Sequence, residues 1–464
     1  MQYDALIIGG GFAGLTAAHF VAKAGLRPLV LEASSEELYL CNSRVCTGAL
    51  HVAFHSPEDS PDTLFEAILT ATDGKASKGI TRALCDNALA TINWMREEGC
   101  DFVQHPRRSY GLPMMAPGRA MRAGLDWENS GPNIFLNSLG AKLQKVGGEI
   151  RRGTRVKELI LENGNIAGIS LESGQNILGK TVVIADGGFQ ADRELLAQYV
   201  TASPDKLRQR NTETGRGDGL RMAITAGAAT LELDKFYGHV LSRDVLKNEN
   251  LWPYPQVDVI CAKGIVVRPD GGRFVNEGLG GIFITNAIAN LKDPLSATAI
   301  FDQTVWDDAK DTDIVPPNPS LRDNGGTVHE ATTLGELAHK VGIDGPALES
   351  TVLEFNESLS KETTYSLKPK RTIEGYLPHT IKTPPFYAIP LCAGITVTSG
   401  GLAVDGFARV LTSQGNPIKG LYAAGSTVGG LEGGPRIGYV GGLIKAFGIG
   451  RIAGLSVGNF LLAT

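Results

Sequence analysis

The chain begins with an apolar run, a glycine-rich turn, a helical pattern and a second apolar run. Residues 5–8 are apolar and lead into a Gly-x-Gly-x-x-Gly motif at 9–14. Apolar positions then follow helical spacing over 15–24, and the next apolar run ends at Glu32. This order predicts a βαβ unit with two buried, parallel strands joined by a helix that packs on them.

Farther along the chain, the hydrophobic pattern and the glycine content change, and these changes divide the chain into regions. Up to residue 236, helices and buried strands are predicted: helical at 62–101, helix then strand at 134–160, strand at 182–189 and helix at 216–227. Short β-like pieces follow at 264–267 and 297–301, then a helical pair at 334–341 and 348–359. Near Pro384 the glycine-rich strand-turn character returns, and a last helix begins at Gly441. We therefore predict a nucleotide-binding domain split into 1–236 and 389–464, interrupted by a second domain at 237–388.

Composition narrows the class of protein. The 464 residues leave room for two or three domains and a large core. The net charge of −5, without clusters of basic residues, argues against a nucleic-acid partner. No run of 18 apolar residues indicates a membrane span, and no signal-peptide pattern precedes the first strand. We therefore expect a cytoplasmic protein that acts on a small molecule.

The cysteines give no metal or disulfide pattern. The six are scattered, with no CxxC pair and no zinc or iron–sulfur spacing, at Cys41, Cys46, Cys85, Cys100, Cys261 and Cys392. We expect free, mostly buried thiols in a reducing compartment and no metal site. Cys46 is of interest because its neighbours are candidates for a cofactor site.

The motif at 9–14 has the chemistry of a dinucleotide site. Gly9 permits a tight turn, Gly11 lets the backbone approach a pyrophosphate, and Gly14 lets the helix pack close to the strand. The helix N-terminus offers unpaired N–H groups to the phosphates. Glu32 suits a ribose hydroxyl pair and would repel a 2′-phosphate. The alternative is a glycine-rich turn with no ligand, which the two strands, the helix and the acid together make the weaker interpretation.

A second glycine-rich segment indicates which dinucleotide is bound. Residues 421–426 read LYAAGS, and Gly441-Gly442-Leu443 begins the last helix. FAD is extended and needs one cradle for ADP and another for the flavin, whereas NAD dehydrogenases usually lack the second. We therefore predict FAD.

These residues resemble a known flavoprotein family. The segments YDALIIGGGFAGLTAA, NSRVCTGA, VVIADGGF, GRGDGLRMAITAGA, RFVNE, GLYAAGS and GRIAG are similar to those of fumarate reductases, 3-ketosteroid dehydrogenases and tricarballylate dehydrogenase. The resemblance covers nearly the whole chain, including cap-like helices at 334–356. It implies an α/β fold: a split Rossmann-like FAD-binding domain of the GR2 type with an inserted α+β cap domain.

The resemblance also implies the residues that bind FAD. They are Gly9, Gly11, Phe12, Ala13, Gly14, Glu32 and Ala33 for the ADP half, Val156 for adenine, Asp218 for the ribityl chain, Asn42, Ser43, Thr47 and Gly48 for the pyrophosphate and flavin, Ala185 and Gly187 beside them, and Gly425, Ser426, Gly441, Gly442 and Leu443 at the pyrimidine end. Family members with covalent FAD carry a histidine where this chain has Ser43, so the FAD should be non-covalent. Ser426 stands where the family often has a glutamate.

Two positions match the family's substrate side. Arg436 corresponds to an arginine that clamps a carboxylate, and His239 is a candidate contact for a substrate anion. The alternatives are a structural ion pair for Arg436 and a histidine satisfied by neighbouring groups for His239. Two departures matter more. Gly281 falls where fumarate reductases place a proton-donating arginine, and 397–399 reads Val-Thr-Ser where they have a histidine.

Those departures argue against fumarate reduction by the usual relay and favour another acid or base. Tyrosine is the obvious replacement. Tyr110 and Tyr254 are the first candidates, and Tyr439 and Tyr237 the less favoured ones. Each alone is more often a packing residue. A basic loop with His105, Arg107 and Arg108 could steer anions or could simply be solvated.

The leading hypothesis is an FAD-dependent dehydrogenase that forms a C=C bond next to a carbonyl or carboxylate of a small, anionic oxo-acid or cyclic ketone. A base would remove the α-proton and the β-hydride would go to the flavin. The same chemistry in reverse, as an enoate or enone reductase, is the first alternative, and the external electron acceptor or donor stays unidentified. An oxidase or monooxygenase fits the cap-like motifs less well. A flavin-binding redox sensor without turnover is the alternative of another class.

Overall fold

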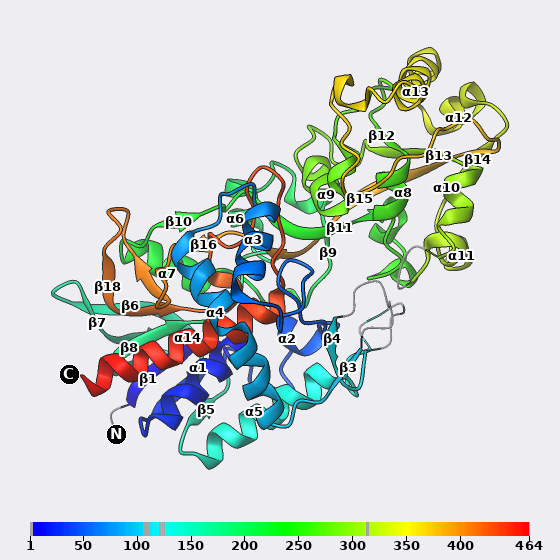
Figure 1. Ribbon diagram of the computed structural model, residues 1–464. Helices are drawn as coiled ribbons and strands as arrows, with labels where there is room; N and C mark the ends of the chain where they lie inside the picture. Colours follow the sequence, from blue (N-terminus) through cyan, green and yellow to red (C-terminus); the bar gives the residue numbers. More distant parts are fainter. Residues whose placement is uncertain are drawn as a thin grey trace.

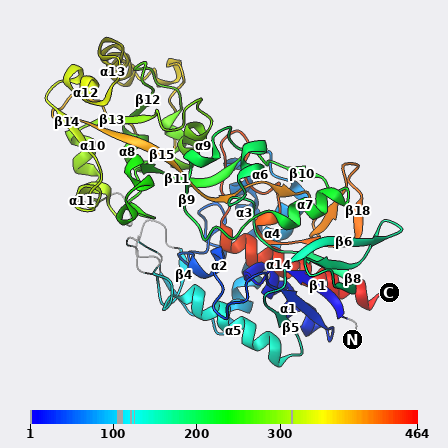
Figure 2. The same ribbon diagram turned by 180° about the vertical axis from the view of Figure 1, so that it is seen from behind.

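The computed structural model describes residues 3–104, 112–119, 122, 124, 126–311 and 315–463. Two regions are visible in Figure 1: a larger one built from both ends of the chain, and a smaller one built from its middle. The ends of the chain lie on the same side of the molecule in both views (Figures 1 and 2).

An eight-stranded sheet forms the larger region. Its main order is β17-β18-β8-β1-β2-β5, with β7 added on β8 and β6 on β7. The strands from β18 to β5 are parallel to their neighbours along this path. Their bounds are β1 Tyr3–Ile8, β2 Pro28–Leu31, β5 Glu149–Arg151, β6 Val156–Glu162, β7 Asn165–Leu171, β8 Asn176–Ile184, β17 Arg409–Leu411 and β18 Pro417–Ala423. The predicted βαβ unit is confirmed, because β1 and β2 pair in parallel with helix α1 (Phe12–Lys23) between them.

The last helix, α14 (Gly442–Leu462), packs against α1. Both lie side by side in the two views (Figures 1 and 2). Small residues make this approach possible: a Cβ on Gly450 would stand 2.6 Å from the carbonyl oxygen of Ala13, and one on Gly454 2.5 Å from that of Ala17. The C-terminal segment therefore completes the layer that the N-terminal segment begins.

The remaining elements of the larger region surround these layers. They are α2 Asn42–Val45, α3 Pro61–Ala71, α4 Lys78–Glu97, β3 Phe102–Gln104, β4 Pro113–Met115, α5 Gly131–Lys145, α6 Arg193–Tyr199, α7 Asp218–Thr225, β10 Thr230–Leu231 and β16 Gly401–Leu402. The helical patterns at 62–101 and 216–227 are confirmed, although a break at 72–77 divides the first into α3 and α4.

A six-stranded sheet forms the smaller region. Strand β15 is 13 residues long and pairs with β11, β13, β14 and the short β9, and β12 pairs with β13. The bounds are β9 Arg208–Gln209, β11 Phe236–Ser242, α8 Asp258–Lys263, β12 Ile265–Val267, α9 Gly281–Ala289, β13 Thr298–Asp302, α10 Gln303–Asp308, α11 Pro317–Asp323, β14 His329–Ala331, α12 Leu334–Val341, α13 Gly345–Ser360 and β15 Phe386–Thr398. The predicted helical pair is therefore present as α12 and α13.

The predicted domain limits fall on the two long strands that join the regions. The limit at 236/237 lies at the start of β11, and the limit at 388/389 lies within β15. Strand β11 pairs antiparallel with the second part of β15, from Phe236 opposite Thr398 to Ser242 opposite Leu391. The connection is thus a hydrogen-bonded ribbon that ends beside the nucleotide-binding sheet. No helix among the described residues is long and apolar enough to cross a membrane.

Candidate active site

Two hollows lie end to end at the junction of the regions. A groove of about 140 Å³ follows the glycine-rich turn after β1, and a cavity of about 340 Å³ opens next to it. They share the lining residues Asn42, Ser43, Val397, Ser426 and Ala446. The two hollows therefore form one continuous passage.

Three consecutive glycines, Gly9 to Gly11, bring the backbone into the lining of the groove. A Cβ on Gly14 would lie 2.0 Å from the carbonyl oxygen of Gly9, so the helix can approach the strand only with glycine there. Gly9 has φ +105°, a conformation that side chains rarely adopt. The hydroxyl of Ser43 accepts a hydrogen bond from the N–H of Phe12 at 3.0 Å, at the first residue of α1.

Acidic and amide groups in the groove match the hydroxyl-rich part of FAD. Glu32 accepts hydrogen bonds from the N–H groups of Gly10 (3.0 Å) and Ser34 (2.9 Å), which hold its carboxylate at the end of β2. Oδ1 of Asp186 and Oε1 of Gln190 are buried acceptors without a partner among the described residues. Because buried acceptors normally find a donor, these two oxygens fit a ligand that brings hydroxyl groups. The residues present therefore fit FAD.

One carboxyl in the groove has an altered acidity. Burial raises the pKa of Asp186 to about 7. The N–H of Gly219, which donates to Oδ2 of Asp186 at 2.7 Å, opposes this shift by lowering the pKa. Asp218, at the start of α7, is ion-paired with Arg155. Because its carboxyl group is buried away from water, Asp186 changes its charge near neutral pH.

Most residues predicted to bind FAD line the passage. In the groove lie Gly9, Gly11, Ala13, Glu32, Ala33, Asn42, Ser43, Val156, Ala185, Gly187, Asp218, Gly425 and Ser426, and in the cavity Thr47, Gly48, Gly442 and Leu443. Three others support it from behind. Phe12 is fully buried against Phe447, Gly14 packs on Gly9, and a Cβ on Gly441 would meet the carbonyl oxygen of His51 at 2.4 Å.

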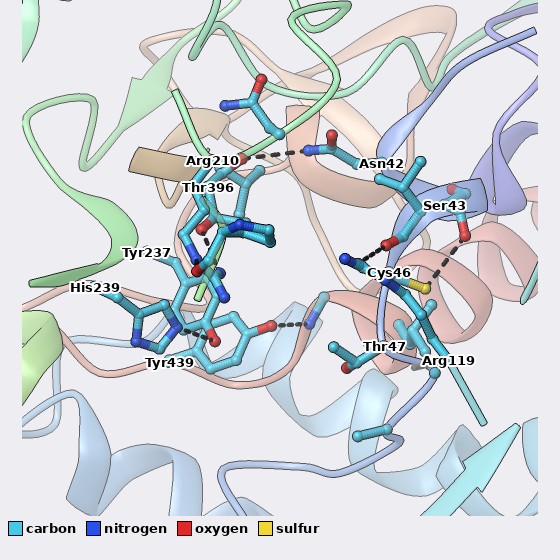
Figure 3. A pocket seen from close by; sticks show the side chains of 18 of the residues that line it. Asn42, Ser43, Cys46, Thr47, Arg119, Arg210, Tyr237, His239, Thr396 and Tyr439 are labelled. Atoms are coloured by element: carbon cyan, nitrogen blue, oxygen red, sulfur yellow. Dashed lines mark hydrogen bonds between the residues drawn. The ribbon is translucent and has the colours of Figure 1, made fainter. Parts of the chain in front are cut away.

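Two stacked tyrosines form one wall of the cavity (Figure 3). The rings of Tyr237 and Tyr439 lie 3.8 Å apart between centroids and 12° from parallel. Tyr237 comes from β11, and Tyr439 from the loop that precedes α14. The wall is therefore assembled across the two regions of the molecule.

Tyr237 belongs to a chain of polar contacts. Its hydroxyl lies 3.0 Å from Nε2 of His239, and Nδ1 of His239 lies 2.5 Å from Oδ2 of Asp258. The other oxygen of Asp258 accepts from the N–H of Val240 at 2.7 Å. A carboxylate that accepts from Nδ1–H fixes the tautomer in which Nε2 accepts a proton from the phenol. The arrangement is an acid–imidazole–phenol relay that ends at the cavity.

The local fold explains why these side chains meet. Tyr237 and His239 are two positions apart on β11 and so share a face of the strand. Between them, a Cβ on Gly238 would lie 2.0 Å from the carbonyl oxygen of Gly394 on β15, so this position admits only glycine. A Cβ on Gly281 would lie 2.1 Å from Cγ of Asp258. The position where the family resemblance leads one to expect an arginine is therefore packed against the relay's carboxylate.

Tyr439 is held differently. Its oxygen accepts a hydrogen bond from the N–H of Gly442 at 2.8 Å, in the first turn of α14. Removal from water raises the pKa of Tyr439 well above its ordinary value, and Tyr237 and Glu432 raise it further. The phenol is therefore neutral near pH 7, with its oxygen fixed and its own proton available as a donor.

The predicted catalytic residues separate into three groups. His239 and Tyr254 line the cavity, and both ring nitrogens of His239 are engaged by the relay. Arg436 is absent from the described lining and pairs with Glu374 at 3.2 Å, where its side chain is 37% exposed. Tyr110 lies outside the described residues, as do His105, Arg107 and Arg108.

Other cavity residues were not predicted. Arg119 and Arg210 have no motif of their own, because each comes from a segment that only the tertiary fold brings to the cavity. Asp258 was not predicted either; it does not belong to the described lining but bonds Nδ1 of His239, which does. Tyr237 was a less favoured candidate, and its position two residues before His239 indicates that both side chains share a face of the strand. Strand spacing alone did not reveal the hydrogen bond between them. Cys46 lines the cavity, yet burial raises the pKa of its thiol to about 12, so it is not a ready nucleophile.

Comparison with known proteins identifies the family. The profile of the FAD binding domain family matches residues 4–438, and the chain belongs to this family. The family predicted from the sequence is therefore confirmed, and with it FAD as the cofactor. The chain is 26% identical to an NADH:acrylate oxidoreductase of Vibrio harveyi, over 91% of its own length and 42% of that protein, so it spans less than half of this relative.

Two further proteins cover the chain more evenly. A 4-oxocyclohexanecarboxylate 2-dehydrogenase of Sinomonas cyclohexanicum is 25% identical, over 91% of this chain and 87% of that one. The solved structure of a 3-ketosteroid-Δ4-(5α)-dehydrogenase from Rhodococcus jostii RHA1 superposes with a TM-score of 0.72 at 22% identity, covering 98% and 97% of the two chains. This likeness confirms the predicted α/β fold with its FAD-binding domain.

Proposed function

We propose that the protein is an FAD-dependent dehydrogenase that introduces a C=C bond next to the carbonyl of a small cyclic oxo-acid. The observation that carries the proposal is the Asp258–His239–Tyr237 relay, which ends on a tyrosine stacked against Tyr439 in the cavity wall. An acid–base pair beside the flavin end of the passage is what removal of an activated α-proton needs.

The two tyrosines take different roles. Tyr439 donates a hydrogen bond to the substrate carbonyl and keeps its proton, because its oxygen already accepts from Gly442 and its raised pKa keeps it neutral. Withdrawal of electron density by this bond acidifies the α-carbon. Tyr237 gives its phenolic proton to Nε2 of His239 and takes the α-proton, while Asp258 stabilises the imidazolium that forms. His239 and Asp258 are thus positioning residues that act through Tyr237.

The groove and the far side of the cavity would hold FAD between Glu32 and Leu443. When bound, FAD supplies the acceptor for the hydride lost from the β-carbon. The dehydrogenase direction is favoured because the evenly covered relative is named for a dehydrogenation next to a ketone. It also agrees with Gly281, which leaves no arginine at the proton-donating position of fumarate reductases.

The test is anaerobic reduction of the protein-bound flavin by 4-oxocyclohexanecarboxylate and other saturated cyclic oxo-acids. We expect wild-type protein to lose its visible flavin absorbance. In Tyr237→Phe the rate of bleaching should fall by about 100- to 10,000-fold, with ligand affinity retained. Tyr387→Phe is the matched control, because Tyr387 bonds Gln303 in the smaller region and does not line the cavity.

The reductase direction is the second candidate, favoured by the relation to the NADH:acrylate oxidoreductase. It predicts the opposite result: oxo-acids leave the flavin oxidised, while chemically reduced protein is reoxidised by the corresponding enones or enoates. If oxo-acids do not reduce the flavin and enones or enoates do not reoxidise it, the proposal is contradicted and a flavin-binding protein without turnover is favoured.

A further inference from the structure

Two arginines face the cavity without an acidic partner. Arg119 is 8% exposed, and its guanidinium donates to the carbonyl oxygens of Val45 (2.5 Å) and Gly124 (3.3 Å). Arg210 donates to the carbonyl of Pro253 at 3.1 Å and contacts the hydroxyl of Thr396 at 3.4 Å. All of these acceptors are neutral, so neither charge is compensated by its hydrogen-bond partners.

The cavity offers no compensating charge either. None of the described residues that line it is an aspartate or glutamate. The Nε atom of Arg119 is buried and has no hydrogen-bond partner among the described residues. Burial of an unpaired cation is costly, and buried donors are normally satisfied. The natural complement to this arrangement is an anion brought by a ligand.

Tyr254 links the two arginines. The guanidinium carbon of Arg210 lies 4.9 Å from the centre of the Tyr254 ring. Burial lowers the pKa of Arg119, while the nearby Tyr254 raises it and the charge of Arg210 lowers it. Asp126 also acts on Arg119, but its carboxylate is taken by Arg122. The two cations are thus close enough to repel each other, which a shared anion would relieve.

The arginine predicted from the sequence is less suited to this role. Arg436 is paired with Glu374 and does not belong to the described lining of the cavity. The arginines also do not line the groove that fits the FAD phosphates, where Arg155 and Arg216 lie instead. An anion at Arg119 and Arg210 would therefore belong to the substrate.

We propose that Arg119 and Arg210 form the carboxylate-binding end of the cavity, so that the substrate is an oxo-acid with its carbonyl at Tyr439 and its carboxylate at these arginines. The inference rests on the proposed function for the position of the carbonyl. It adds the residues that select an anionic substrate and excludes neutral ketones as good ligands. A planar guanidinium suits a carboxylate, since it can donate two parallel hydrogen bonds.

The test uses oxidised holoprotein and two probes that share a ring ketone: 4-oxocyclohexanecarboxylate and its uncharged methyl ester. Affinity is read from the perturbation of the flavin spectrum under anaerobic conditions, separately from bleaching. Loss of a charged hydrogen bond should weaken binding of the acid by about 30-fold or more in Arg210→Gln, with the ester's affinity unchanged. Arg210→Lys should retain part of the preference for the acid.

Arg208→Gln is the matched control. Arg208 is two residues from Arg210 but pairs with Glu249 and lies against Trp252, outside the cavity lining. It should keep the wild-type ratio of acid to ester affinity. Arg119→Gln is an independent second variant, accepted only where it retains bound FAD, and it should also lower the ratio.

Several outcomes would overturn the inference. They are equal affinity of the wild type for acid and ester, absence of binding by the acid, an equal loss of both probes in Arg210→Gln, or loss of the preference in Arg436→Gln alone. Failure of the proposed function looks different: the acid would bind tightly through these arginines and yet neither reduce the flavin nor, as its unsaturated analogue, reoxidise it.

Discussion

Seven glycines line the groove, where the backbone itself can meet FAD, whereas two line the cavity, where other side chains make up the rest of the described lining. The groove follows the turn at residues 9–14 and is completed by the segments around Arg155, Asp186 and Arg216. The cavity draws on β11, the loop before α14, the loop at 253–256 and the segment around Arg119. A backbone cradle tolerates no added volume, while a cavity of side chains can change its chemistry one residue at a time.

The groove and the cavity also differ in the charged residues that line them. The groove contains carboxyl groups at Glu32, Asp186 and Asp218. The described lining of the cavity contains two arginines and two histidines but no carboxylate. A hydroxyl-rich, extended ligand suits the first, and an anionic substrate suits the second. Substitutions in the groove and in the cavity test this comparison separately.

The largest effect is expected from a side chain at Gly14. In Gly14→Val the new Cβ would stand 2.0 Å from the Gly9 carbonyl oxygen, which forces the helix off the strand and closes the cradle. We expect protein without bound FAD, measured by the ratio of visible to ultraviolet absorbance. Gly79→Ala, where the nearest atom is 3.5 Å away, should keep its FAD. Normal FAD content in Gly14→Val would contradict the backbone cradle.

The next effect concerns Asp186 and pH. Its pKa of about 7 in the folded chain exceeds the ordinary 3.8, so the folded state prefers the protonated form. The free energy of unfolding of the FAD-free protein should therefore fall as pH rises from about 4 through about 7, by as much as about 4 kcal/mol. Urea denaturation at pH 5 and pH 8 measures this. Asp186→Asn should flatten the dependence, and an equal slope in both proteins would exclude Asp186 as its cause.

A smaller effect is expected in the relay of the cavity. Asp258→Asn keeps the size of the side chain but removes the charge that stabilises imidazolium at His239, so flavin reduction should slow by about 100-fold. Stopped-flow bleaching across a pH series measures the rate and the position of the pH profile. FAD content and ligand affinity should stay near wild type. An unchanged rate and profile would remove Asp258 from the relay.

The smallest effect is expected where the two regions touch at the surface. Glu374 is 72% exposed and Arg436 is 37% exposed, so solvent screens their ion pair. Glu374→Gln should change the free energy of unfolding by less than about 1 kcal/mol. Urea denaturation measures this. A loss of several kcal/mol would mean that the pair holds the regions together, contrary to its exposure.

Sequence reasoning was most informative where structure follows from the local pattern of residues. The turn at 9–14, the acid Glu32 and the small residues at 441–442 could be interpreted one segment at a time, because glycine positions and strand ends carry their own chemistry. The helices α12 and α13 were likewise predicted from spacing. Among the candidate tyrosines, Tyr237 and Tyr439 form the stacked wall, while Tyr254 lies beside Arg210.

By itself, the sequence determined the fold class, the family and the cofactor. Only the tertiary structure decided which side chains share the cavity. The 13-residue strand β15 brings Thr396 and Val397 from the smaller region to the passage, and β11, paired with it, brings Tyr237 and His239. The physical reason is that the glycine turn at 9–14 is encoded by consecutive residues, whereas a proton relay and an unpaired cation depend on long-range pairing and burial.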